Sequence, residues 1–256
     1  MPITRRALLI SNPGELGAEN YCRGVHVDVK NYNRLMLSPE GGAWDAGEVQ
    51  TMDRPSAIEV RRWIRDNSIH DYVFIMFSGH GWFSSVDKDR VLDLRKDETV
   101  TSNELLAGTR KRTLILDCCQ KIHRESSRFV RASATALLAN EARQIRVANR
   151  ETCKRLFFEN IVSAESGFVR MCSCQIGEVS NDDDATGGYY NSGLIDTADG
   201  WAFQQAKNTW GGNASMSVVV AHETAAQATR TRSAGLQNPS IEKARTGPYF
   251  PFSVFG

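Results

Sequence analysis

The feature that most constrains the fold is a nearly unbroken apolar run from Asp71 to Ser78, with the sequence DYVFIMFS. A strand with one face in solvent alternates apolar and polar residues, whereas this run indicates a strand that is buried on both faces. Two shorter runs, Ala7 to Ser11 and Thr113 to Leu116, have the same character. Strands of this kind are typical of a parallel sheet that is covered by helices on both sides.

Segments with the helical spacing of apolar residues alternate with these strands. Helices are predicted at Val25 to Leu37, Ser56 to Asp66 with Pro55 in the first turn, Thr101 to Ala107, Arg131 to Phe158, Tyr190 to Lys207 and Met216 to Arg230. A further strand is predicted at Phe168 to Cys174, a late strand or an apolar tail that packs back onto the body at Pro248 to Phe255, and a mobile loop at Gln175 to Gly188. The alternation predicts an α/β fold with a mainly parallel central sheet. Without an internal repeat or a long linker, residues 1–256 are expected to form a single domain.

The charge balance narrows the class of partner. The chain has 31 basic and 30 acidic residues, a net charge of +1, which gives no electrostatic reason to expect nucleic acid or an anionic membrane. The apolar run near the N-terminus is too short for a signal peptide or a membrane span. The six cysteines are therefore expected to be free thiols, and a reducing cytoplasm is the expected location.

Two of the predicted strands turn abruptly polar where they end. Ser78 to Gly81 (SGHG) follows one strand, and Asp117 to Cys119 (DCC) follows another. If the two strands are neighbours, His80 and Cys119 face one crevice at the carboxyl edge of the sheet. A histidine there can take the proton of the thiol, which then attacks a carbonyl, and can return that proton to a leaving amine.

The same two segments offer a way to stabilise the oxyanion of a tetrahedral intermediate. Such an oxyanion needs backbone N–H donors, and a glycine beside the histidine allows bare backbone to approach the substrate. The backbone N–H groups of Gly81 and Cys119 are the candidate donors.

Together, these motifs resemble the caspase and metacaspase superfamily of cysteine peptidases. Similar segments are Gly24 to Tyr32 (GVHVDVKNY), Met171 to Ser180 (MCSCQIGEVS) and Gln237 to Pro239 (QNP). His80 and Cys119 are 119 − 80 = 39 residues apart, against about 50 in caspases. The residues after Cys119, Gln-Lys-Ile, depart from the His-Ser-Gly that usually follows in metacaspases.

The resemblance implies a three-layer caspase-like sandwich, with helices on both faces of a mainly parallel sheet. It also implies a thiol protease that acts on protein or peptide substrates and is closest to prokaryotic metacaspase-like proteins. No metal or organic cofactor is required by this chemistry, and a regulatory protein partner is a further expectation. The family pattern places the nucleophile in the third position of the DCC unit, Cys119, and strand alternation then turns Cys118 the other way.

The resemblance also indicates specificity. Caspases that cut after aspartate have arginines in the primary pocket, whereas metacaspases have acids there. Asp28 and Asp117 correspond to such acids, and Ser78 can add a hydroxyl group. These three residues are expected to bind substrate, and bidentate pairing with a guanidinium leads us to expect cleavage after Arg, or after Lys.

Some acidic and basic clusters keep more than one interpretation. Asp182 to Asp184 are interpreted as a solvated loop, with a calcium site as the alternative, and the same applies to Asp87, Asp89, Asp93 and Asp97. The arginines between Lys121 and Arg155 form a solvated helix face, a region of self-cleavage, or a docking surface for an acidic partner.

Two other functions are consistent with the sequence. One is a catalytically silent caspase-fold module that binds or regulates; intact His80 and Cys119 argue against it. The other is a thiol redox or metal-binding protein built on Cys118, Cys119, Cys172 and Cys174, against which the lack of a Cys-x-x-Cys unit argues.

Overall fold

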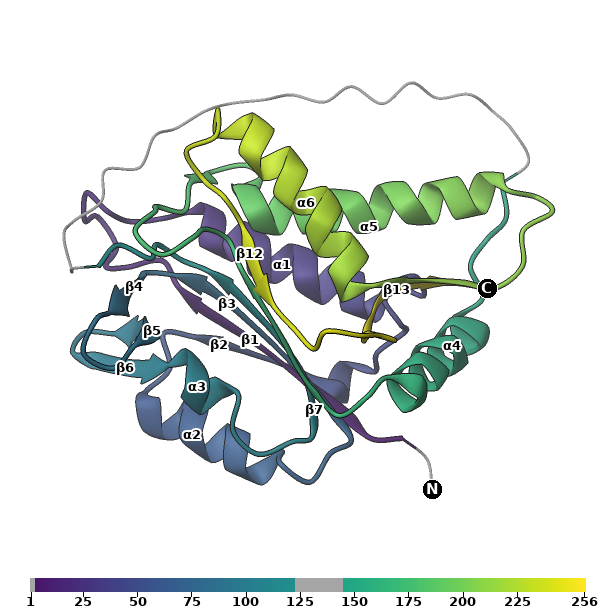
Figure 1. The fold of residues 1–256 in the computed structure, drawn as a ribbon, viewed down its shortest axis with the longest axis horizontal. Coiled ribbons are helices and arrows are strands. Elements are labelled where there is room, and N and C mark those ends of the chain that lie inside the picture. The colour runs from purple at the N-terminus through teal and green to yellow at the C-terminus, as the bar shows by residue number, and fades with distance from the viewer. Residues whose placement is uncertain (1–2, 123–144) are drawn as a thin grey trace.

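At the centre of the computed structural model, which describes residues 3–122 and 145–256, lies a six-stranded sheet in the order β12-β8-β7-β3-β1-β2 (Figure 1). Its strands are β1 (Arg5–Asn12), β2 (Val49–Asp53), β3 (Tyr72–Gly79), β7 (Lys111–Asp117), β8 (Gly167–Cys172) and β12 (Ser240–Glu242). Five of them run parallel, and β12 pairs with β8 in the antiparallel sense. The prediction of a mainly parallel sheet is confirmed.

Helices and a small second sheet cover the two faces of this sheet. One face packs against α1 (Gly24–Leu37), α4 (Arg150–Ser163), α5 (Tyr189–Lys207) and α6 (Val218–Arg232). The other packs against α2 (Ala57–Asp66), α3 (Ser102–Leu105) and a three-stranded sheet of β4 (Gly81–Ser84), β5 (Asp89–Arg95) and β6 (Glu98–Thr101). The result is the three-layer α/β sandwich that the sequence predicts.

The apolar runs form strands because both of their faces have an apolar layer to contact. In β3, Phe74 and Met76 belong to the core beneath α1, α4, α5 and α6, whereas Ile75 and Phe77 belong to the core beneath α2 and α3. All four side chains are buried, and burying one side chain of this size contributes about 1.5–3 kcal/mol. A polar residue at any of these positions would face apolar neighbours on either side of the sheet.

Several elements differ from the sequence prediction. Pro55 lies before helix α2 rather than in its first turn, because Ser56 is the N-cap and accepts a hydrogen bond from the Glu59 backbone N–H. The strands β2, β4, β5, β6 and β12 carry mixed polar sequences and are absent from the prediction. The C-terminal strand β13 (Pro251–Phe255) pairs with β11 (Ala214–Ser217) in a separate ribbon.

Two predicted segments change their boundaries. The helix predicted at Arg131 to Phe158 falls partly on 123–144, outside the described residues; the described part, α4, begins at Arg150 and ends at Ser163. The segment predicted as a mobile loop, Gln175 to Gly188, contains a short hairpin of β9 (Asp182–Asp183) and β10 (Gly187–Gly188).

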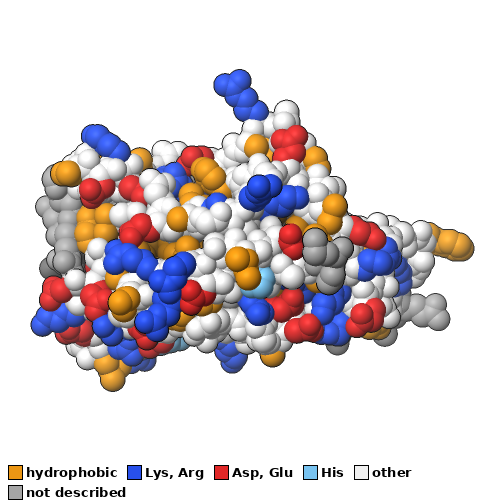
Figure 2. Space-filling view, turned by 90° about the horizontal axis from the view of Figure 1, so that it is seen from below, with side chains coloured by type: hydrophobic (Ala, Val, Ile, Leu, Met, Phe, Trp, Pro, Cys, Tyr) orange, Lys and Arg blue, Asp and Glu red, His pale blue; other side chains and the backbone are white. Residues whose placement is uncertain are grey.

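Charged side chains of both signs are interspersed on the face seen in Figure 2. Around α2 and the small sheet, arginines pair with acids: Arg61 with Glu104 at 2.7 Å, Arg65 with Asp66 at 3.1 Å and Arg95 with Glu98 at 2.5 Å. Across the described ranges, no helix combines the length and the apolar character that a membrane crossing needs.

Candidate active site

The candidate nucleophile and base follow two hydrogen-bonded neighbours of the sheet. β3 and β7 pair in parallel, with Ser78 opposite Asp117. His80 and Cys119 each lie two residues beyond this pair, at the carboxyl edge of the sheet, which is at the left of Figure 1. The condition set by the sequence, that the two strands be adjacent, is met.

The two adjacent cysteines have different surroundings. Cys118 belongs to the apolar core beneath α2 and α3, and its burial there raises the pKa of its thiol well above the usual value. Cys119 lines a small cavity at the strand ends, and its Sγ lies 3.8 Å from the carbonyl oxygen of Ser180. Since a thiolate is the reactive form, these surroundings favour Cys119 over Cys118 as the nucleophile.

His80 packs against the loop between β1 and α1. Its Nε2 atom lies 3.9 Å from the Sγ atom of Cys22. Gly14, with φ of +92°, is so close that a Cβ atom there would lie 3.0 Å from the same nitrogen. Cys22 has no role predicted from the sequence, where its one signal is its position just before the family-like segment from Gly24 to Tyr32.

The glycine after the histidine has a steric role in the fold. A Cβ atom on Gly81 would lie 2.8 Å from the carbonyl oxygen of Val91 and 3.0 Å from the Sγ atom of Cys118. The sequence analysis explained this glycine by the approach of substrate; the structure adds that β4 lies directly against Cys118 and the neighbouring strand β5. The role of its N–H as an oxyanion donor stays a prediction.

The structure brings Asp28, Ser78 and Asp117 together in the cavity that Cys119 lines. Asp28 accepts hydrogen bonds from Ser78 Oγ at 2.6 Å, from the Gly188 N–H at 3.0 Å and from Asn191 Nδ2 at 3.0 Å. Asp117 accepts from Ser180 Oγ and from the Asn191 N–H at 3.1 Å. Both carboxyl groups thus have neutral donors and are buried.

A third acid, Asp182, lines the same cavity. The interpretation of Asp182 to Asp184 as a solvated loop fails for Asp182, which is partly buried in the β9–β10 hairpin and lines the cavity, whereas Asp184 is exposed. Burial, followed by the charges of Asp117 and Asp184, raises the pKa of Asp182 to about 6. Its buried Oδ2 atom has no hydrogen-bond partner within the described part of the chain.

Three carboxyl groups thus line one small cavity. Burial raises the pKa of Asp28 and of Asp117, and the charge of Asp117 raises that of Asp28 further. Within residues 3–122 and 145–256, no lysine or arginine forms an ion pair with Asp28, Asp117 or Asp182. An arriving cation would relieve this repulsion and restore the charged form of the acids.

Two consecutive glycines permit the hairpin to approach the acids. A Cβ atom on Gly187 would lie 2.1 Å from Oδ1 of Asp28, and one on Gly188 would lie 2.2 Å from Oδ2 of Asp117. Any side chain at either position would displace a carboxylate. The sequence analysis recognised this glycine pair as a loop signal and did not connect it with the pocket.

The other acids named as calcium candidates do not line this cavity. Asp89 is buried beneath α3, where it accepts hydrogen bonds from Ser102 Oγ at 2.5 Å and from the Asn103 N–H at 2.9 Å, with Arg170 at 3.7 Å. The described residues contain no group of three or more His, Cys, Asp or Glu side chains arranged to hold a metal ion. None of the six cysteines, all of which lie in the described residues, forms a disulfide, as predicted.

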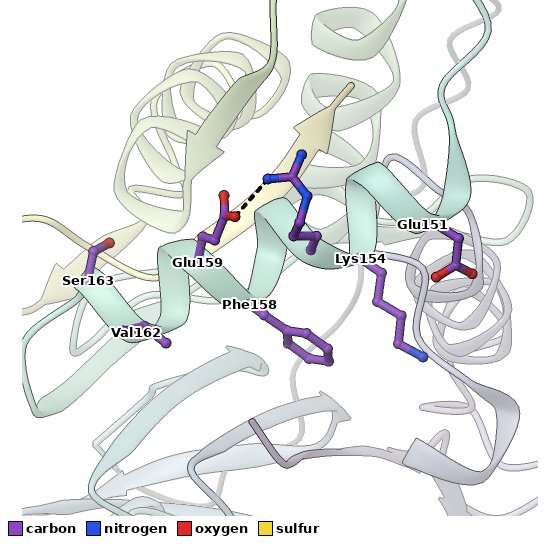
Figure 3. Close-up of a pocket in the computed structure, with 7 residues that line it drawn as sticks. Glu151, Lys154, Phe158, Glu159, Val162 and Ser163 are labelled. Carbon is purple, nitrogen blue, oxygen red and sulfur yellow. Dashed lines mark hydrogen bonds and ion pairs between the residues drawn. The ribbon is translucent and has the colours of Figure 1, made fainter. Parts of the chain in front are cut away.

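A wider depression, on the outer face of α4, lacks the convergent polar groups of a reactive site (Figure 3). Both of its basic side chains already pair within the fold: Arg155 with Glu159 at 2.7 Å and Lys154 with Asp45 at 2.6 Å. Phe158, which projects from the helix between them, packs under the guanidinium of Arg5. We therefore place the candidate active site at the strand ends.

Comparison with known proteins identifies a family and a solved structure of similar fold. The family model described as a caspase domain matches residues 4–249. A crystal structure of caspase-1 from Spodoptera frugiperda superimposes with a TM-score of 0.58, at 13% identity, over 97% of this chain and 90% of that one. A search of curated protein sequences finds no match.

Proposed function

Since the chain belongs to the caspase-domain family of cysteine peptidases, we propose that it is an active endopeptidase that cleaves after Arg or Lys, with Cys119 and His80 as its catalytic dyad. The observation that carries the specificity is the set of three carboxyl groups, Asp28, Asp117 and Asp182, in the cavity beside Cys119. Peptidases of this family cut next to the side chain that fills such a pocket, so the charge of the pocket selects the residue before the cut.

The proposed reaction runs in two steps. Cys119 Sγ gives its proton to the imidazole of His80 and attacks the carbonyl carbon of the scissile bond, while the N–H groups of Gly81 and Cys119 stabilise the oxyanion. His80 returns the proton to the leaving amine as the C–N bond breaks. Water, deprotonated by His80, then hydrolyses the thioester and restores the free thiol.

The pocket favours arginine for a geometric reason. A guanidinium presents several N–H donors in a plane and can pair with more than one carboxylate at once, whereas an ammonium is a point charge. The cavity is small, about 20 Å³, which is room for about one water molecule. An arginine side chain would therefore enter with an outward movement of the hairpin that carries Asp182.

A panel of short fluorogenic peptides tests the proposal. The peptides carry Arg, Lys, Asp or citrulline, a neutral isostere of arginine, before the scissile bond. We expect cleavage of the Arg peptide, slower cleavage of the Lys peptide, and little of the others. A preference for Asp would overturn the specificity, and failure to cleave any peptide would favour a silent binding module.

Acidification is expected to weaken the preference for arginine. Because the raised pKa of Asp182 is about 6, its carboxyl group is neutral below that pH and charged above it. The ratio of kcat/KM for the Arg peptide over the citrulline peptide should fall about tenfold as the pH drops from 7.5 to 5. The ratio removes the effect of protonation of the dyad, because that protonation changes the cleavage of both peptides equally.

The matched control is Asp182→Asn, which keeps the shape of the side chain and removes its charge. Its ratio should be low at pH 7.5 and should change little between pH 7.5 and 5. A variant that keeps the full pH dependence of the wild type would show that other groups produce it.

A further inference from the structure

We infer that Gln237 is a positioning residue of the specificity pocket, because it fixes Ser180 and, through Ser180, the carboxylate of Asp117. The inference rests on the proposed function of that pocket. Gln237 lies beyond the end of α6, 118 residues after Cys119 in the sequence, in the QNP segment that the function has so far left without a role.

Gln237 uses every hydrogen-bonding group of its side chain. Its Oε1 atom accepts from the Asn181 N–H at 2.9 Å and from Asn181 Nδ2 at 3.1 Å. Its Nε2 atom donates to the Ser173 carbonyl oxygen at 2.9 Å and to Ser180 Oγ at 3.2 Å. The residue is fully buried, so these bonds have no competition from water. The amide therefore ties the end of β8 to the start of the pocket loop.

Ser180 transmits this anchor to the reactive groups. Its Oγ atom donates to Oδ1 of Asp117, and its carbonyl oxygen lies 3.8 Å from the Sγ atom of Cys119. A serine hydroxyl has one proton, and an N–H donor on its oxygen leaves that proton free to point toward the carboxylate. By donating to Ser180 Oγ, Gln237 orients the hydroxyl toward Asp117.

The neighbouring residue extends the same anchor to the nucleophile loop. Asn238 donates from its backbone N–H and from Nδ2 to the carboxylate of Glu178, both at 2.8 Å. The carbonyl oxygen of Glu178 in turn accepts from the N–H of Gln120, the residue after Cys119, at 2.9 Å. The segment after α6 thus holds both ends of the loop from Glu178 to Asn181.

Mutual repulsion makes such an anchor necessary. Asp28, Asp117 and Asp182 line one cavity, and their like charges oppose a compact arrangement. The fixed base of the hairpin keeps Asp117 beside Asp28 in the cavity. Without the hydrogen bonds of Gln237, the loop from Ser180 to Asp182 is expected to move away from the strand ends. The distances between the three carboxyl groups would then increase.

The test is Gln237→Met, which keeps the length of the side chain and removes its hydrogen bonds. We expect the Arg-to-citrulline ratio of kcat/KM to fall about tenfold, mainly through a higher KM for the Arg peptide, because the lost anchor is equivalent to one or two hydrogen bonds. The control is Asn160→Leu on α4, where Nδ2 donates to the Leu156 carbonyl oxygen at 2.8 Å and Oδ1 accepts from Ser215 Oγ at 3.0 Å. This variant should lower Tm without changing the ratio.

A second measurement does not require peptidase activity. Cys119 is modified with a cationic and with a neutral methanethiosulfonate reagent, and the two rates are read by peptide mapping. In the wild type the cationic reagent should react faster because of the acidic pocket, and Gln237→Met should reduce that advantage. Should Gln237→Met fail to fold, Gln237→Leu, which also removes the hydrogen bonds and adds no charge, gives the same two readouts.

The outcomes separate the two proposals. If the wild type cleaves no peptide and the reagent ratio still depends on Gln237, the proposed function fails and the positioning role stands. If both ratios in the Gln237 variants equal those of the wild type, or if Asn160→Leu lowers them equally, the positioning role is overturned.

Discussion

Replacing Cys119 with alanine is expected to abolish peptide cleavage, with a fall in kcat/KM for the Arg peptide of about 10⁴-fold or more. The variant removes the only atom that forms the covalent intermediate in the proposed reaction. Its Tm should remain close to that of the wild type, because Cys119 borders the pocket rather than the packed apolar layers. Initial-rate kinetics and thermal unfolding measure the two effects.

Cys118→Ala is the matched control for this prediction. Cys118 is buried against the small sheet and has a strongly raised thiol pKa, so its loss should affect packing and not chemistry. We expect activity within about threefold of the wild type and a loss of stability of about 1 kcal/mol. If activity survives in Cys119→Ala and disappears in Cys118→Ala, the two cysteines have the opposite roles.

Asp117→Asn is expected to lower kcat/KM for the Arg peptide by about 100-fold or more, because it removes one buried partner of the incoming cation. Cleavage of the citrulline peptide should change far less, since a neutral side chain gains little from the carboxylate. Asparagine can still accept the hydrogen bond from the Asn191 N–H. Kinetics on both peptides at pH 8 make the comparison.

The thermal stability of Asp117→Asn, unlike its activity, should not fall. Burial raises the pKa of Asp117 above its value in the unfolded chain. The folded protein therefore loses stability as the pH rises from that unfolded value through the folded one. Asparagine removes this loss, so Tm at pH 8 should not fall. A large drop in Tm would mean that the lost activity reflects unfolding.

Asp89→Asn supplies the contrasting case. Asp89 is equally buried, and it lies 3.7 Å from Arg170 beneath α3, away from the cavity. Removing this partner leaves the guanidinium less well compensated, so the variant should lose stability. The preference for arginine should remain unchanged, because Asp89 does not line the pocket. Equal losses of preference in both variants would contradict the assignment of Asp117.

The sequence predicted the central strands because their signal is local. A strand such as β3 is apolar on both faces and is stable only when a layer of the fold covers each face. Its burial therefore follows from its own residues. β2 and the strands of the small sheet have mixed sequences with partly exposed positions, and nothing within four or five residues distinguishes them from loops. Their pairing depends on partners elsewhere in the chain.

The same division holds at the candidate site. His80 and Cys119 could be proposed from sequence because each follows a recognisable strand, and parallel strands present their carboxyl ends at one edge. Asp28 was proposed only through a family resemblance. Asp182 was interpreted as solvated, since a carboxylate in a polar, glycine-containing segment carries no local sign that a hairpin will fold over the sheet.

By itself, then, the sequence determined the four strands β1, β3, β7 and β8 of the sheet and the two side chains that follow β3 and β7 at its edge, since short-range patterning specifies burial. Only the tertiary structure decided what surrounds them. Cys118 lies in the apolar core whereas Cys119 lines the cavity, and Cys22, Asp182 and Gln237 reach the strand ends from segments far along the chain. Such residues are placed by loop closure and hydrogen bonds between distant segments, which no local pattern records.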